Sequence, residues 1–169
     1  MAFKAKMLGR EATMRKLRRI VPEAEAELAV AQLDVAREAA GKIAARAPVG
    51  ATGAYKASIE GGRLADRPAQ ERALGGQPTK DKNATGVFAA WFWRFLEFGT
   101  SAHTIRAKNA PALRFRGLGG ELVSKQSVKH PGTAAQPHIF PTWRAYRKTA
   151  RRKMANAVNK AVRKAMGKK

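Results

Sequence analysis

The sequence predicts an α+β fold, in which a small, mostly antiparallel sheet packs against two long helices. Three features of the chain support this prediction. An apolar stripe at helical spacing ends at Ala47, short β-type segments separated by Gly- and Pro-rich stretches follow it, and a second helical stripe fills residues 141–165. A chain of 169 residues is long enough for one such domain around a modest core. We therefore predict a single α+β domain over residues 22–165.

The first long helix is predicted over residues 22–47. Pro22 suits a first helical position, and the glutamates that follow it suit the positive end of a helix dipole. Glu38 and Lys42 are four residues apart and are expected to pair on the exposed side. Pro48 should end the helix, because it disfavours helical backbone in the preceding residue. The apolar stripe consists of Ala26, Val30, Leu33, Ala36, Ala40, Ile43 and Ala47.

The sheet is predicted from four short segments, near residues 55–60, 85–90, 112–116 and 121–128. The last two flank a glycine-rich turn and should form a hairpin arm. Two stretches rich in Gly, Pro and charge are predicted to be extended arms, at about residues 61–82 and 101–135.

The aromatic run from Trp91 to Leu96 fits a strand or a short helix, and its apolar spacing favours the helix. Its aromatic side chains could stack on nucleic-acid bases, but their clustering in an apolar run favours the core. The stretch after it that holds three prolines, residues 128–141, is predicted to be an ordered loop leading into the last helix.

The last helix is predicted over residues 141–165, followed by a basic tail at 166–169. Its apolar stripe consists of Trp143, Tyr146, Ala150, Met154, Ala157, Val158, Ala161 and Ala165. The opposite face is basic and is predicted to contact DNA or an acidic partner. It carries Arg144, Arg147, Lys148, Arg151, Arg152, Lys160, Arg163 and Lys164.

The net charge of +22 is the strongest compositional signal, and it points to polyanionic surroundings. The last acidic residue is Glu121, so the surplus lies largely at the two ends of the chain. The basic lead-in, residues 1–21, is expected to hold a short helix at about 10–19. Two interpretations of the last helix stay open: it binds phosphates, or it is solvated or docked on an acidic neighbour.

Catalytic, metal and cofactor sites are not predicted. The chain has no cysteine, and its three histidines, His103, His130 and His138, do not have the spacing of a zinc site. No serine lies in a nucleophile elbow, and the glycine run at 117–120 lacks the Lys-Ser/Thr of a phosphate loop. No apolar run is long enough to cross a bilayer. We therefore predict a protein that is not an enzyme, needs no cofactor and has no membrane partner.

Three short motifs follow one another in the sequence. The first is Ala-Pro-Val-Gly-Ala-Thr-Gly-Ala-Tyr at residues 47–55, the second is Glu-Phe-Gly-Thr at 97–100, and the third is His-Pro-Gly-Thr-Ala-Ala-Gln-Pro at 130–137. Glycine permits backbone conformations that other residues rarely adopt, threonine can hydrogen-bond a nearby backbone group, and proline stiffens a path. We interpret these motifs as joint-shaping segments of a scaffold, and two roles stay open for each of their residues: a contact between subunits, or a turn without any contact function.

In this order the motifs resemble a siphophage neck family, whose members are also called head–tail joining or tail-completion proteins. That family has a Pro-Val-Asp-Thr-Gly motif, a Glu-Phe-Gly-Thr motif and a closing Ala-Gln-Pro-Phe-Leu-x-Pro motif before its last helix. The resemblance covers about residues 10–165. This chain departs from the pattern at Gly50-Ala51, which replaces the aspartate, and at His138, which replaces the phenylalanine.

The resemblance implies a structural virion protein at the head–tail junction of a tailed phage or of a phage-like particle such as a gene transfer agent. It implies a closed ring, most simply a hexamer, with head-completion or connector proteins and a tail terminator or tail tube protein as neighbours. Non-specific contact with packaged DNA would fit this place, and assembly would occur in the host cytoplasm. The implied subunit contacts are Thr52, Gly53, Glu97, Phe98, Gly99, Thr100, His130, Pro131, Gly132, Gln136 and Pro137.

Three other functions are weighed against this one. A tail terminator ring would also be a small α+β protein beside the tail tube. A basic nucleic-acid-binding accessory protein would use the two basic ends of the chain. An enzyme of unrecognised type is the weakest alternative, because none of the motifs resembles a catalytic constellation.

Overall fold

The computed structural model describes residues 10–67, 81–117 and 119–167. The chain divides into two compact units. The helical unit comprises the chain up to Ala90 together with everything from Ile139 onward, and the arm unit comprises residues 91–138. Both helices and antiparallel strands are present, so the α+β prediction is confirmed.

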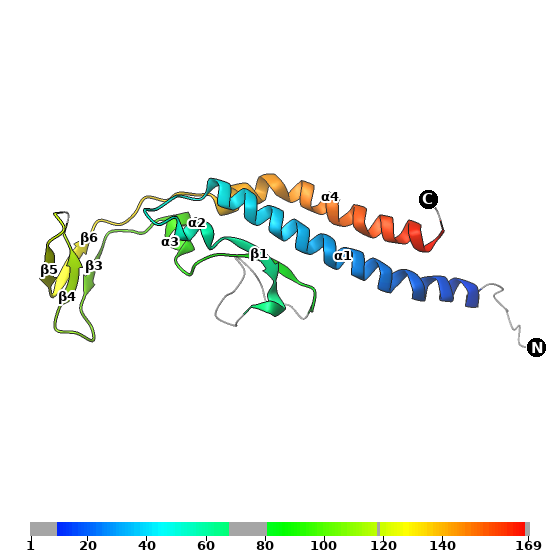
Figure 1. Cartoon of the computed structure of the whole chain (residues 1–169), viewed down its shortest axis with the longest axis horizontal. Helices are drawn as coiled ribbons and strands as arrows, with labels where there is room; N and C mark the ends of the chain where they lie inside the picture. Colours follow the sequence, from blue (N-terminus) through cyan, green and yellow to red (C-terminus); the bar gives the residue numbers. More distant parts are fainter. Residues whose placement is uncertain (1–9, 68–80, 118, 168–169) are drawn as a thin grey trace, which may run out of the picture. The chain divides into compact units, whose positions relative to one another are not determined.

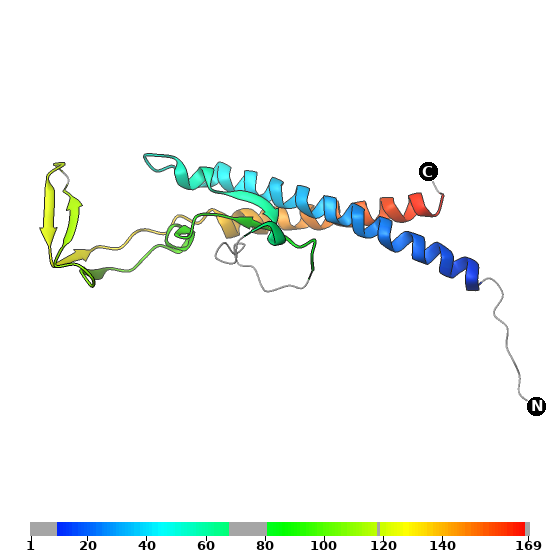
Figure 2. The same ribbon diagram turned by 60° about the horizontal axis from the view of Figure 1, so that its bottom comes forward.

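The helical unit is organised around two long helices, α1 (Arg10–Arg46) and α4 (Ile139–Ala165). They lie side by side and run in opposite directions (Figures 1 and 2). The centre of their contact buries Val35 and Ala39 of α1 against Tyr146 and Ala150 of α4. Small side chains at this contact let the two backbones approach closely, and each fully buried large side chain contributes about 1.5–3 kcal/mol.

The predicted start of the first helix is wrong. α1 runs without interruption from Arg10 through Pro22, so the expected separate helix at 10–19 and the new start at Pro22 merge into one helix. The φ angle that proline imposes is close to the helical value, and one missing N–H removes one backbone hydrogen bond. The flanking Ala, Leu, Glu, Arg and Lys residues favour helix and offset that loss.

The predicted apolar stripes are only partly buried. On α1, Ala36, Ala40 and Ile43 are buried as expected, and so is Ala47 just after the helix, whereas Ala26 and Val30 are exposed. On α4, Tyr146, Ala150 and Ala161 are buried, and Ile139 and Thr142 extend the buried face toward the start of the helix. Trp143 was predicted to belong to this face, yet it is 37% exposed.

A two-stranded ribbon packs on α1 in the helical unit. It consists of β1 (Glu60–Arg63) and β2 (Thr85–Phe88), which pair antiparallel from Glu60↔Phe88 to Arg63↔Thr85. The short 3₁₀ helix η1 (Leu64–Asp66) follows β1. Most of the predicted arm at 61–82 lies outside the described residues.

The strand predicted at 55–60 is wrong over most of its length. Residues Ala54–Ala57 form the single helical turn α2, and the strand starts only at Glu60. Ser58 closes this turn, since its hydroxyl donates a 2.7 Å hydrogen bond to the Tyr55 carbonyl and accepts a 3.0 Å bond from the Ala90 N–H. The side chain of Tyr55 is buried, which anchors the turn.

The arm unit contains one short helix and two further antiparallel ribbons. The helix is α3 (Trp93–Phe98), as the spacing of the aromatic run predicts. One ribbon pairs β3 (His103–Arg106) with β6 (Ser127–His130), and the other pairs β4 (Leu113–Arg116) with β5 (Leu122–Lys125). The predicted hairpin arm is therefore confirmed as β4–β5.

Two expectations about the sheet are wrong. The strands form three separate two-stranded sheets in place of one sheet. The loop predicted from residue 128 begins later, because residues 127–130 form β6 opposite β3. Both errors have the same cause: strand partners far apart in sequence are chosen by tertiary contacts, which a short polar segment such as β3 does not signal.

Candidate assembly site

The second and third motifs meet in the arm unit at a buried carboxylate. Glu97 at the end of α3 is 2% exposed and His138 is 1% exposed. The backbone N–H of His138 donates a 2.8 Å hydrogen bond to Glu97 Oε2, and His138 Nδ1 lies 3.3 Å from the same oxygen. His138 Nδ1 also lies 2.6 Å from the Gln136 carbonyl oxygen. A burial this deep requires such partners, because an unpaired buried carboxylate is costly.

Backbone hydrogen bonds join the same two motifs. Thr100 and Thr133 form an antiparallel bridge with N···O distances of 2.9 and 3.0 Å, and the Gln136 N–H donates to the Leu96 carbonyl at 2.8 Å. We call this set of contacts the joint; it comprises residues 96–100 and 132–138. The joint holds together the two chain segments that lead into and out of the β3–β6 ribbon.

Two glycines allow the two backbone segments of the joint to come this close to each other. Gly99 has φ +71° and Gly132 has φ +88°, in the region that favours glycine. A Cβ at Gly99 would lie 2.5 Å from the Thr133 carbonyl oxygen, and a Cβ at Gly132 would lie 2.3 Å from that of Thr100. The glycines of the two motifs therefore serve one purpose, which is to let the two backbone segments touch.

Large aromatic side chains next to the joint are exposed. Trp91 is 80% exposed, Phe98 is 63% exposed and Phe95 is 49% exposed. Trp91 stacks edge-to-face on Phe95 with ring centroids 5.9 Å apart. The prediction that the aromatic run belongs to the core is therefore wrong for Trp91 and Phe95, because α3 is too short to cover them within its unit.

The buried residues of the arm unit are polar, which is unusual for the interior of a protein. Of its described residues, Glu97 and His138 are the ones classed as buried, and both are polar. Apolar side chains on the ribbons remain accessible, with Leu122 at 74%, Ile105 at 40% and Phe115 at 39% exposure. Two-stranded ribbons are marginally stable alone, so this unit gains little stability from apolar burial of its own.

The β3–β6 ribbon has two chemically distinct faces. Directly opposed residues share a face. On β3–β6, Thr104 with Lys129 and Arg106 with Ser127 make a polar face, and Ile105 with Val128 belongs to the other. The second face also carries His103 opposite His130, whose ring centroids are 5.0 Å apart. The β3–β6 ribbon therefore presents its cations and its apolar residues on opposite faces.

The remaining predicted contact residues lie in two places. His130 Nδ1 accepts a 3.1 Å hydrogen bond from the Gly132 N–H, and the intervening Pro131 is exposed, as are Gln136 and Pro137. Thr52 and Gly53 belong to the helical unit, where Gly53 has φ +63° and precedes α2. The structure brings the second and third motifs together, while the first forms a separate turn after α1.

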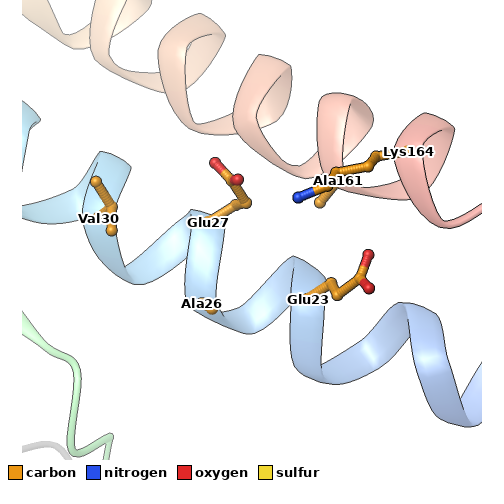
Figure 3. Close-up of a pocket in the computed structure, with 6 residues that line it drawn as sticks. All are labelled: Glu23, Ala26, Glu27, Val30, Ala161 and Lys164. Carbon is orange, nitrogen blue, oxygen red and sulfur yellow. The ribbon is translucent and has the colours of Figure 1, made fainter. Parts of the chain in front are cut away.

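The basic residues of α4 divide into an outer and an inner set. Arg144, Arg147, Lys148, Arg151 and Arg152 are exposed, as are Lys160 and Arg163 further along; these seven residues are called the basic face below. Lys153 and Lys164 are exposed as well, and they form the inner set because each lies near acidic residues of α1. Lys164, with Ala161, lines a groove of about 400 Å³ between the helices, opposite Glu23, Ala26, Glu27 and Val30 (Figure 3).

Glu38 of α1 forms the other polar link to α4. Its carboxylate accepts a 2.7 Å hydrogen bond from the Tyr146 hydroxyl, pairs with Lys153, and lies 3.5 Å from Lys42. The expected pairing of Glu38 with Lys42 is thus confirmed, but its expected place on the exposed side of the helix is wrong, because Glu38 also contacts α4. The bonds from Lys153 and Tyr146 lower the pKa of Glu38 to about 2, and burial together with the Glu38 carboxylate raises the pKa of Tyr146. Sequence reasoning did not identify this link, because its partners are more than 100 residues apart.

The described residues contain neither a cluster suited to a metal ion nor a helix suited to cross a membrane. Over residues 10–67, 81–117 and 119–167, no group of three or more His, Asp or Glu side chains is placed to hold a metal ion. In the same ranges, no helix combines the length and the apolar character that a bilayer crossing requires.

Comparison of the chain with protein-family models, with curated proteins and with solved structures gave no match.

Proposed function

We propose that this protein is a structural component of a tailed phage or of a phage-like particle, and that it forms a closed ring at the junction between head and tail. The proposal starts from the order of the three motifs, which resembles that of the siphophage neck family. It is an assembly function, in which contacts between copies and with unlike neighbours replace bond-making chemistry.

The observation that carries the proposal is the composition of the arm unit's interior. Its buried residues are the polar pair Glu97 and His138, while Trp91 and Phe98 beside them are exposed. Monomeric proteins rarely leave clusters of large apolar side chains in contact with water, and such clusters mark interaction surfaces. Aromatic residues are also the anchors that dominate binding energy at interfaces.

The joint supports the same interpretation. An arm that binds a neighbouring subunit loses less entropy on binding when its own two chain segments are already held together. The Thr100–Thr133 bridge and the Glu97–His138 bond fix both chain segments at the base of the ribbon. Contacts of one surface with a different surface on the next copy are heterologous, and they close into a ring when the rotation permits.

Two experiments test the proposal. The full chain is purified, and its mass is measured by size-exclusion chromatography with light scattering. Particles are then produced with and without the gene and imaged by electron microscopy. We expect a discrete ring-sized oligomer, and DNA-filled heads separated from tails when the gene is absent.

A cryo-electron map of the complete particle distinguishes the closest alternative. Density for the protein between the connector and the tail is expected; density at the end of the tail tube alone would assign it as a tail terminator. A monomer that is absent from finished particles, or normal particles made without the gene, would overturn the proposal.

A further inference from the structure

We propose that the basic face of α4 binds duplex DNA through its phosphates, without reading base sequence. The inference adds a ligand to the proposed function, and it rests on that function only for the source of the DNA, which would be the packaged genome. The surface itself is defined by residues of the helical unit alone.

The first part of the basic face is a dense cationic stripe. Arg144, Lys148 and Arg151 follow at steps of four and three residues, so they lie on one side of the helix. Eight residues separate Arg144 from Arg152, which corresponds to about 12 Å along the helix. Duplex DNA carries one negative charge per ~1.7 Å of axis when both strands are counted, so a stretch as long as this stripe holds roughly seven phosphates on its two strands together.

Acidic side chains do not neutralise this stripe from within α4, because no Asp or Glu occurs after Glu121. The acids of α1 that face α4 contact other residues. Glu38 pairs with Lys153 and bonds Tyr146, while Glu23 and Glu27 line the groove with Lys164 (Figure 3). Glu38 therefore pairs with Lys153, Glu23 and Glu27 lie at the groove that Lys164 lines, and the seven residues of the basic face are exposed to solvent.

A membrane surface fits this helix less well than DNA does. A helix that lies in a membrane interface must bury its apolar face among the lipids. The apolar face of α4 already packs on α1, where Tyr146 is 5% and Ala150 is 0% exposed. Binding lipid through that face would require the two long helices to separate.

An acidic protein surface also fits less well. Stable protein interfaces are anchored by buried aromatic or aliphatic side chains, with charges at the rim. Within α4, which the structure describes in full, Trp143 is the large apolar residue that is exposed, and it lies at the start of the basic face. Phosphate contacts need no such anchor, because counterion release supplies the affinity.

The test measures binding of the full chain to a fluorescein-labelled 30-base-pair duplex of random sequence, by fluorescence anisotropy, at several salt concentrations. If about four phosphates are neutralised, affinity should fall roughly 100-fold between 50 and 200 mM salt. Two duplexes of unrelated sequence should bind equally.

The test variant is Lys148→Gln with Arg152→Gln, which removes two outward cations of α4. At 100 mM salt we expect affinity to fall about 50-fold, and the slope of log K against log salt to lessen by about 2. The matched control is Arg37→Gln with Lys56→Gln, which removes the same charge from exposed positions elsewhere in the helical unit. A second comparison is Arg114→Gln with Arg116→Gln, on the exposed β4 strand of the arm unit. Circular dichroism verifies that all variants keep their helices.

Several outcomes would overturn the inference. These are no binding of wild type at 50 mM salt, equal loss in the test and control variants, loss in the β4 variant alone, or binding to phosphatidylserine vesicles without binding to duplex. The result is independent of the proposed function. A ring that does not bind DNA would contradict the proposed DNA binding and leave the proposed function standing. A monomer that binds DNA through Lys148 and Arg152 would contradict ring formation and leave the DNA binding standing.

Discussion

The backbone N–H of His138 donates a 2.8 Å hydrogen bond to the carboxylate of Glu97, and both side chains are almost completely buried. This bond connects the end of α3 with the residue that precedes α4 in the chain. The two motifs that resemble those of phage neck proteins are thereby one structural feature, although about thirty residues of arm separate them along the sequence.

Replacing Glu97 with alanine should loosen the joint. A hydrogen bond to a charged group contributes about 1.5–3 kcal/mol, and its loss leaves the His138 N–H buried without this acceptor. Amide hydrogen exchange at Gln136 and His138 should accelerate about 10-fold or more. The control is Glu121→Gln, which changes an exposed carboxylate of the same unit. Equal protection of both amides in Glu97→Ala and wild type would contradict the role given to this bond.

Gly132→Ala should break the Thr100–Thr133 bridge. The new Cβ would lie 2.3 Å from the Thr100 carbonyl oxygen, and the φ of +88° adds strain of about 1–3 kcal/mol. Gly120→Ala separates the two effects, because Gly120 has φ +83° and nothing within 4 Å of the added Cβ. We expect faster amide exchange at Thr100 and Thr133 in the first variant only. If Gly120→Ala perturbs these amides as strongly, close approach is not the reason for Gly132.

Trp91→Ser combined with Phe98→Ser should abolish self-association with little effect on folding. Both side chains are exposed in the isolated chain, so their removal should change its unfolding free energy by less than about 0.5 kcal/mol. Light scattering measures the oligomer, and thermal unfolding measures stability.

Val21→Ser is the control for this variant, because Val21 is 52% exposed, lies in the helical unit and belongs to none of the three motifs. It should leave the oligomer unchanged. An intact oligomer in the double variant would show that the aromatic segment is not an interface.

Acid should weaken the pairing of α1 with α4 through Glu38. Its pKa is lowered from 4.5 to about 2 in the folded chain, so the carboxylate contributes stability that is present above pH 4.5. That contribution should be lost as the pH falls from about 4.5 toward 2, because protonation removes the attraction to Lys153.

The stability difference between wild type and Glu38→Gln, measured by urea unfolding at several pH values, should therefore shrink over this window. Glu25→Gln provides the comparison, since Glu25 is an exposed carboxylate on the same helix. A difference that stays constant between pH 6 and pH 2.5 would contradict the assignment.

Features that depend on neighbouring residues could be predicted from the amino-acid sequence. Periodic apolar residues placed both long helices, Pro48 placed the end of α1, and the glycine-rich turn placed the β4–β5 hairpin. These signals act within a few residues, so they can be recognised without knowledge of the rest of the chain.

Tertiary structure alone decided the features that depend on distant partners. Three separate ribbons in place of one sheet, and the exposure of Trp91, follow from what each segment finds to pack against. The meeting of Glu97 with His138 has the same origin. The type of a side chain indicates how costly its burial is without a partner. Only the folded chain decides whether a hydrogen-bonding or packing partner is present.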